Sequence, residues 1–129
     1  MKKILLDTNF LMAWGQFKVD IFTQIDKIST FRYELFTLDK NLDELNKIIE
    51  EQKGKDKDAA KIALKLIDVK GIKIMKTKSN QKTDDLILDL ASKKDFIVAT
   101  QDKFLKSRLK EKRVPMMVLR QKKKVIFYS

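Results

Sequence analysis

The sequence predicts an α/β protein in which a parallel β-sheet is flanked by helices on both faces. Two features of the 129-residue chain carry this prediction: short apolar runs typical of buried strands, and amphipathic segments of helical period that alternate with them. No internal repeat or long linker divides the chain, so we expect a single domain over residues 1–129. In sheets of this class, ligands bind outside the carboxyl ends of the strands.

The amino-terminal half supplies three of the predicted strands. Ile4, Leu5 and Leu6 form a buried run, and the predicted loop after it is marked by Gly15. Asp39 is the expected N-cap of one helix, and Gly71 is expected to end another. The predicted elements are a strand at 4–6, a helix at 17–29, a strand at 33–38, helices at 39–49 and 56–67, and a strand at 72–75.

The carboxyl-terminal half continues the same alternation after a polar loop over residues 76–82. Thr83 is the expected N-cap of the next helix, and Pro115 is expected to open the penultimate strand. The predicted elements are a helix at 84–93, a strand at 96–99, a helix at 103–112, and strands at 116–119 and 125–128.

The composition excludes several classes of protein. The chain has no Cys and no His, which excludes a disulfide framework, a Ser-His-Asp hydrolase and a His-based zinc site. Its three glycines are too scattered for a phosphate-binding loop. No apolar run is long enough to act as a signal peptide or to span a membrane, so we expect a cytoplasmic protein without a membrane partner.

Positive charge is concentrated near the carboxyl terminus. The formal net charge is +11, and residues 101–129 contain ten Lys or Arg against two acids, a net charge of +8. A basic block of this kind indicates a polyanionic partner, with nucleic acid favoured over membrane. The alternative is a solvated Lys-rich surface, as in many thermophile proteins.

Four acids occupy equivalent positions in the predicted fold. Asp7 ends the first strand, Glu44 lies early in the helix after the second, Asp84 opens the helix after the third, and Asp102 follows the fourth. All four belong to the carboxyl edge of the sheet. Each has an ordinary alternative: a turn residue for Asp7, an exposed helical position for Glu44, and favourable interaction with a helix dipole for Asp84 and Asp102.

Carboxylates that converge on one pocket repel one another and require a cation. Mg²⁺ or Mn²⁺ prefers such oxygen ligands, retains several waters and bridges to phosphate, and it can activate water without a histidine. Beside a basic segment, this arrangement suits metal-dependent cleavage of a phosphodiester bond.

The four acidic motifs resemble, in order, those of the PIN-domain (PilT N-terminal) ribonucleases. These motifs are Leu6-Asp7-Thr8-Asn9, Leu42-Asp43-Glu44-Leu45, Thr83-Asp84-Asp85-Leu86-Ile87 and Val98-Ala99-Thr100-Gln101-Asp102. The resemblance covers nearly the whole chain and implies a three-layer α/β/α fold with a parallel sheet of strand order 3-2-1-4-5. It also implies that the four acids named above are catalytic metal ligands for Mg²⁺ or Mn²⁺.

The resemblance implies supporting roles for residues beside the acids. Thr8 or Asn9 would support the first acid, and Thr100 lies in the fourth motif. Asp85 forms a doublet with Asp84; the position of Ile87, three residues after Asp84, favours Asp84 as the ligand and places Asp85 in a supporting or surface position.

Within this family, the fourth motif and the segment over residues 114–123 resemble the archaeal and eukaryotic endonucleases that process small-subunit ribosomal RNA. We therefore expect an endoribonuclease acting on precursor ribosomal RNA, with a homodimer or a pre-ribosomal complex as further partners. The expected RNA contacts are Arg120, Lys122, Lys123 and Lys124.

The sequence leaves two alternative functions open and disfavours a third. The first is a VapC-type toxin ribonuclease that pairs with an antitoxin, and the second is an inactive RNA-binding PIN module. The third, a haloacid-dehalogenase-like phosphatase, expects an Asp two residues after the nucleophile, where this chain has Asn9.

Overall fold

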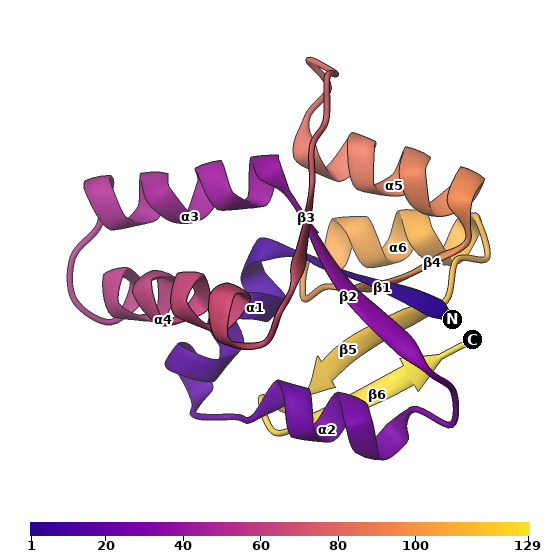
Figure 1. The fold of residues 1–129 in the computed structure, drawn as a ribbon, viewed down its shortest axis with the longest axis horizontal. Helices are drawn as coiled ribbons and strands as arrows, with labels where there is room; N and C mark the ends of the chain where they lie inside the picture. The colour runs from indigo at the N-terminus through magenta and orange to yellow at the C-terminus, as the bar shows by residue number, and fades with distance from the viewer.

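The computed structural model describes residues 1–129 and contains one six-stranded sheet in the order β3-β2-β1-β4-β5-β6 (Figure 1). The first five strands are parallel, as predicted, and β6 is antiparallel to β5. The strands are β1 (Lys2–Leu6), β2 (Tyr33–Leu38), β3 (Lys73–Met75), β4 (Phe96–Ala99), β5 (Met116–Arg120) and β6 (Lys124–Tyr128).

The antiparallel strand β6 adds one member to the predicted strand order. Only three residues separate it from β5, whereas a parallel connection needs a crossover of about a dozen residues or more. The chain reverses in a turn closed by the Lys123 amide, which donates to the Arg120 carbonyl at 3.0 Å. Gln121 and Lys122, the central residues of that turn, both have positive φ, as in the turns whose twist suits a hairpin.

Helices cover both faces of the sheet, which gives the predicted three layers. Ile4 and Leu6 of β1 belong to the larger core cluster, on the side of the first four helices, whereas Leu5 belongs to the cluster beneath the last two. This alternation is what a strand buried on both faces requires. The helices are α1 (Thr8–Phe17), α2 (Ile21–Ile28), α3 (Asp39–Glu51), α4 (Lys55–Val69), α5 (Thr83–Lys94) and α6 (Lys103–Glu111).

The predicted loop around Gly15 is wrong, because Gly15 lies inside α1. A Cβ atom at this position would lie 2.6 Å from the Ala59 Cα of α4. The glycine therefore permits close packing of two helix backbones instead of marking a break in the chain. The helix α1 was therefore not predicted, and the predicted helix at 17–29 corresponds to α2, which begins only at Ile21.

Two predicted N-caps are displaced by one residue. Asp39 and Thr83 are the first residues of α3 and α5, and Leu38 and Lys82 are the N-caps. The Asp39 carboxylate instead accepts hydrogen bonds from the Thr77 amide and hydroxyl, which ties the start of α3 to the loop after β3. Helices long and apolar enough to cross a membrane are absent.

Candidate active site

Asp7 lies at the point where β1 ends and α1 begins. Its amide donates to the Ala99 carbonyl of β4 at 2.9 Å, so the two central strands end side by side. Its side chain caps α1 by accepting a hydrogen bond from the Thr8 amide at 2.9 Å. The helix start therefore fixes the carboxylate at the carboxyl edge of the sheet, where Asp7 is only 5% exposed.

Two further donors orient the Asp7 carboxylate. The Thr100 hydroxyl donates to Oδ2 at 2.8 Å, and Asn41 Nδ2 donates to Oδ1 at 3.1 Å. Each donor comes from a different element, one from the end of β4 and one from the first turn of α3. The carboxylate is thus held by three segments that are distant in sequence.

Asn41 is the polar centre of this site, and the sequence analysis did not identify it. Its Oδ1 accepts from the Leu38 amide at 3.0 Å and from the Thr37 hydroxyl at 3.2 Å. Its Nδ2 lies within 3.3 Å of acceptors on Asp7, Thr8 and Glu44. Asn41 is completely buried, and a polar side chain four residues before Leu45, on the apolar face of α3, is the signal that could have identified it.

Glu44 reaches the same site from the first turns of α3. The Thr8 hydroxyl donates to Glu44 Oε1 at 2.5 Å and accepts from Asn41 Nδ2 at 2.9 Å. Thr8 therefore contacts both acids: its amide donates to Asp7, the acid it was predicted to support, and its hydroxyl donates to Glu44.

Asp84 and Asp102 enter from the opposite side, at the starts of α5 and α6. Asp102 is the N-cap of α6, and its Oδ1 accepts from the Leu105 amide at 2.9 Å. Asp84 is half-buried in the first turn of α5. Asp85 turns away from both and forms an ion pair with Arg108 of α6 at 2.7 Å.

The four predicted acids line one cavity of about 480 Å³ at the carboxyl edge of the sheet. The other lining residues come mainly from α1 and α3. They are Thr8, Asn9, Met12, Lys47, Ile48, Glu51 and Gln52. No three of the acidic side chains lie close enough together in this structure to ligate a single ion.

Electrostatic coupling shows that these carboxylates share one environment. Burial raises the pKa of Asp7 from 3.8 to about 6, and repulsion from Glu44 and Asp84 adds to the rise, while hydrogen bonds from Thr100 and Thr8 oppose it. Burial also raises the pKa of Asp84, with repulsion from Asp102 and Glu44 as the next causes. At neutral pH the pocket is therefore an unfavourable place for four negative charges.

The donor set suits a hard divalent cation. All four groups are carboxylates. A bound Mg²⁺ or Mn²⁺ would compensate the electrostatic repulsion among them. Asp7, Glu44, Asp84 and Asp102 are the residues that would hold such an ion.

Asn9 and Gln101 connect the site to β5. Asn9 Oδ1 accepts from the Gln101 amide at 2.9 Å. The Gln101 side chain accepts from the Leu119 amide at 2.6 Å and donates to the Leu119 carbonyl at 3.0 Å. The residue before Asp102 therefore fixes the end of β5, next to Arg120.

The predicted RNA-binding cluster lies apart from the acidic cavity. Lys122 and Lys123 line a separate depression with residues of α1 and α2. Lys122 Nζ lies 5.2 Å from the centre of the Phe17 ring, and the Lys123 carbonyl accepts from Gln24. Arg120 and Lys124 pair across the hairpin, with Arg120 following directly on Leu119. A role in RNA binding stays a prediction for these four residues.

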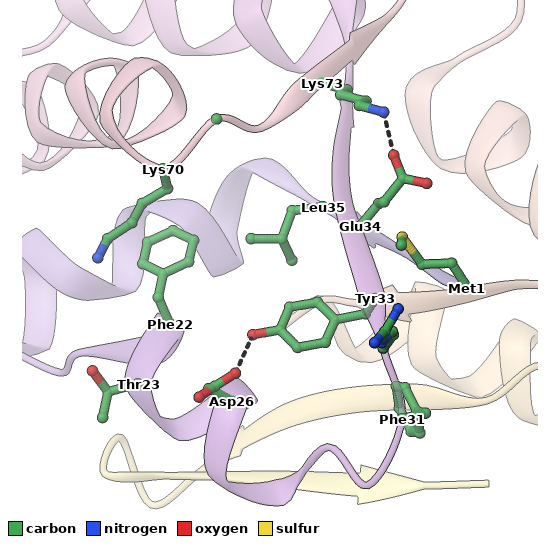
Figure 2. A pocket seen from close by; sticks show the side chains of 12 residues that line it. Met1, Phe22, Thr23, Asp26, Phe31, Tyr33, Glu34, Leu35, Lys70 and Lys73 are labelled. Atoms are coloured by element: carbon green, nitrogen blue, oxygen red, sulfur yellow. Dashed lines mark hydrogen bonds and ion pairs between the residues drawn. The ribbon is translucent and has the colours of Figure 1, made fainter.

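A larger cavity, of about 810 Å³, lies at the amino-terminal end of β2 (Figure 2). Four of its polar side chains are paired: the Tyr33 hydroxyl donates to Asp26 at 3.0 Å, and Lys73 forms an ion pair with Glu34. Burial and the bond to Asp26 raise the pKa of Tyr33 to about 12, so this phenol stays protonated. The cavity shares no residue with the acidic one, and size alone does not make it the site of chemistry.

A family model described as "PIN like domain" matches residues 4–122, which includes all four acids. The chain belongs to the PIN-like domain family. The resemblance predicted from the four motifs is therefore confirmed, as is the fold that it implied.

Two curated relatives of this PIN-like chain are archaeal ribonucleases. Ribonuclease VapC4 of Methanocaldococcus jannaschii is 34% identical over 95% of this chain and 94% of its own length. Ribonuclease VapC9 of Archaeoglobus fulgidus is 32% identical over 93% of this chain and 84% of its own length.

Solved structures agree with the fold. The PIN domain endonuclease Utp24 superposes with a TM-score of 0.75 at 23% identity, covering 97% of this chain and 90% of that one. A domain of a functionally unknown protein from M. jannaschii superposes with a TM-score of 0.61 at 15% identity, covering 92% of this chain and 91% of that one. At these identities the superpositions show the fold alone.

Proposed function

We propose that this PIN-like protein is a divalent-metal-dependent endoribonuclease. The observation that carries the proposal is the convergence of Asp7, Glu44, Asp84 and Asp102, from four separate elements, on one cavity at the carboxyl edge of the sheet. Relatives above 30% identity that are named ribonucleases support RNA as the substrate.

The chain's own residues have distinct tasks in this proposal. Asn41 and Thr100 orient the Asp7 carboxylate, and Thr8 holds Glu44 beside it. Lys47, at the rim of the cavity, supplies a positive charge for a phosphate oxygen of the substrate. A bound Mg²⁺ or Mn²⁺ would activate water and stabilise the charge that develops at phosphorus.

The identity of the RNA is a narrower part of the proposal. The curated relatives favour a VapC-type ribonuclease, with an antitoxin protein as partner. The likeness to Utp24 is one of fold, so action on precursor ribosomal RNA stays a prediction from the sequence motifs. Parallel assays on precursor ribosomal RNA and on tRNA decide between these substrates.

The test compares wild type with Asp7→Asn on structured RNA in Mn²⁺ or Mg²⁺. We expect endonucleolytic products from the wild type alone, and none in EDTA. Circular dichroism of both proteins serves as the folding control. Equal cleavage by the variant, or full activity in EDTA, would contradict the proposal, and RNA binding without cleavage by the wild type would favour the inactive module.

A further inference from the structure

Phe104 is the most exposed large apolar side chain of the protein, at 80%. It lies in the first turn of α6, whose core-facing side is formed by the buried residues Leu105 and Leu109. The Phe104 ring therefore contributes little to the core. Keeping a whole aromatic ring in water forgoes the free energy that burial would supply.

The position of Phe104 relates it to the acidic cavity. It follows Asp102, the N-cap of α6, by two residues, which is about 3 Å along a helix axis at roughly 1.5 Å per residue. Helical side chains lean towards the helix amino terminus, so the ring inclines towards the sheet edge where the cavity opens.

The ion pair between α5 and α6 identifies the side of α6 on which Phe104 lies. Arg108, four residues later, shares a helix face with Phe104 and binds Asp85. Asp85 directly follows Asp84, a lining residue of the cavity. The two helices lie next to one another and begin at the same edge (Figure 1). The Phe104 ring thus lies at the end of α6 that begins at the cavity, on the α5 side, without lining the cavity itself.

The helix that carries the ring is basic. Lys103 directly precedes Phe104 and has no ion-pair partner, and Arg108 lies one turn further along the same side, whereas Lys106 and Lys110 lie on the other side of α6, in a depression with Met116 and Tyr128. An exposed aromatic ring on a basic helix matches the combination that binds single-stranded nucleic acid: cations contact phosphates, and bases stack on the ring.

We propose that Phe104 is a positioning residue on which a base of single-stranded RNA stacks, next to the phosphodiester bond that the acidic cavity receives. The inference rests on the proposed ribonuclease function. It adds a contact between the protein and an RNA base close to the bond that is cleaved. Stacking tolerates any base, so Phe104 would set affinity and register without selecting a sequence.

The test measures binding of fluorescein-labelled 12-nucleotide oligo(U) and oligo(A) in EDTA, which prevents cleavage. We expect Phe104→Ala to weaken binding of both by about 5- to 150-fold, the range for loss of one base–aromatic stack. Phe104→Leu should bind the oligonucleotides as weakly as Phe104→Ala, because leucine is apolar but has no aromatic face for stacking. Phe104→Trp should bind at least as well as wild type. Val69→Ala, at another exposed apolar position, is the matched control and should bind normally.

Three further readouts separate stacking from a structural effect. The salt dependence of binding should keep its slope in Phe104→Ala, because the variant retains every cation that faces a phosphate. The added indole of Phe104→Trp should be quenched by oligo(U), measured against the wild-type signal of Trp14. In cleavage assays with Mn²⁺, KM should rise more than kcat falls.

Several outcomes would overturn the inference. Wild-type affinity of Phe104→Ala would do so even if the wild type cleaves RNA and Asp7→Asn does not, which leaves the proposed function standing. A wild type that binds neither oligonucleotide would overturn it as well. Self-association that Phe104→Ala abolishes, with RNA affinity unchanged, would assign the ring to an interface between copies of the chain.

Discussion

At the scale of single residues, burial makes the ionised form of the Asp7 carboxylate less favourable in the folded protein than in water. Its pKa in the fold is about 6, against an ordinary value of 3.8, so the folded state binds the proton more tightly than the unfolded chain. The stability that this proton provides is present below about pH 4 and is lost as the pH rises through about 6. The difference corresponds to roughly 3 kcal/mol at neutral pH.

Asp7→Asn should therefore stabilise the metal-free protein at pH 7.5, by up to about 3 kcal/mol. The asparagine can accept from the Thr8 amide and donate to the Thr100 hydroxyl, so no buried group loses its partner. Urea unfolding in EDTA between pH 4 and 8 checks this, and the variant should also show a smaller decline across that range. A variant less stable than wild type at pH 7.5 would contradict the pKa assignment.

Asn41→Asp is the opposite change and should destabilise the metal-free protein. It removes the donor shared by Asp7, Thr8 and Glu44 and adds a buried negative charge beside two others. Loss of a buried hydrogen-bonding partner costs about 1–3 kcal/mol, more where charge is involved. Unfolding at pH 7.5 should show this cost, and at pH 4, where Asp7 is protonated because its pKa is about 6, the cost should shrink. Equal destabilisation at both pH values would argue against charge repulsion as the cause.

At the scale of secondary-structure elements, the packing of α1 against α4 depends on the absence of a side chain at Gly15. Gly15→Ala would raise helix propensity by about 1 kcal/mol in an exposed helix. Here its Cβ meets the Ala59 backbone, so the helices must separate, at a cost of about 1–3 kcal/mol. We therefore expect a lower melting temperature.

The double variant Gly15→Ala, Ala59→Gly is the control for Gly15. The closest atom is the Ala59 Cα, which a glycine also has, so removing the Ala59 side chain should not restore stability. A stabilising effect of Gly15→Ala alone would contradict the close approach of the two helices.

The turn between β5 and β6 tests the predicted RNA contacts of the basic cluster. Replacing Lys122, Lys123 and Lys124 together by Gln should weaken binding to many RNAs equally, because phosphate contacts do not select sequence. Each lysine–phosphate interaction that the substitutions remove should reduce the salt slope by about 0.7 for single-stranded RNA. Binding at several salt concentrations measures this, and an unchanged slope would leave the lysines as a solvated turn that packs on Phe17 and Gln24.

At the scale of the whole molecule, metal binding should be linked to folding. Burial raises the pKa values of Asp7 and Asp84, and the repulsion that adds to the rise acts only in the folded state, where separate elements bring the acids together. Millimolar Mn²⁺ should raise the melting temperature, with a gain of about 2.7 kcal/mol at 100 times the dissociation constant.

Asp84→Asn should be at least as stable as wild type without metal and should respond less to Mn²⁺. Differential scanning fluorimetry over a Mn²⁺ titration measures both effects. The triple Gln variant of the β5–β6 turn is the matched control, because it leaves every acid in place and should keep the full metal response. A wild-type melting curve indifferent to Mn²⁺ would contradict a shared metal site.

Local patterns in the sequence were enough to predict the order of the strands, every helix except α1, and the four acids at the sheet edge. These follow from local periodicity and from the rule that parallel strands present their carboxyl ends together. The strands at 33–38 and 96–99 lie where predicted. The strand at 96–99 is buried on both faces, as a short apolar run in this class should be, whereas the first four residues of the strand at 33–38 are only half-buried.

The roles of Gly15 and Asn41 emerge only from packing in three dimensions. In the sequence, a glycine at position 15 indicates a loop. Its place inside a helix is explained only by the close approach of α4, whose Ala59 Cα would lie 2.6 Å from a Cβ atom at position 15. The position of Asn41 on the apolar face of its helix marks it as a buried polar residue, but only the fold surrounds it with acceptors on Asp7, Thr8 and Glu44. Contacts between segments distant in sequence are set by packing, which no local pattern encodes.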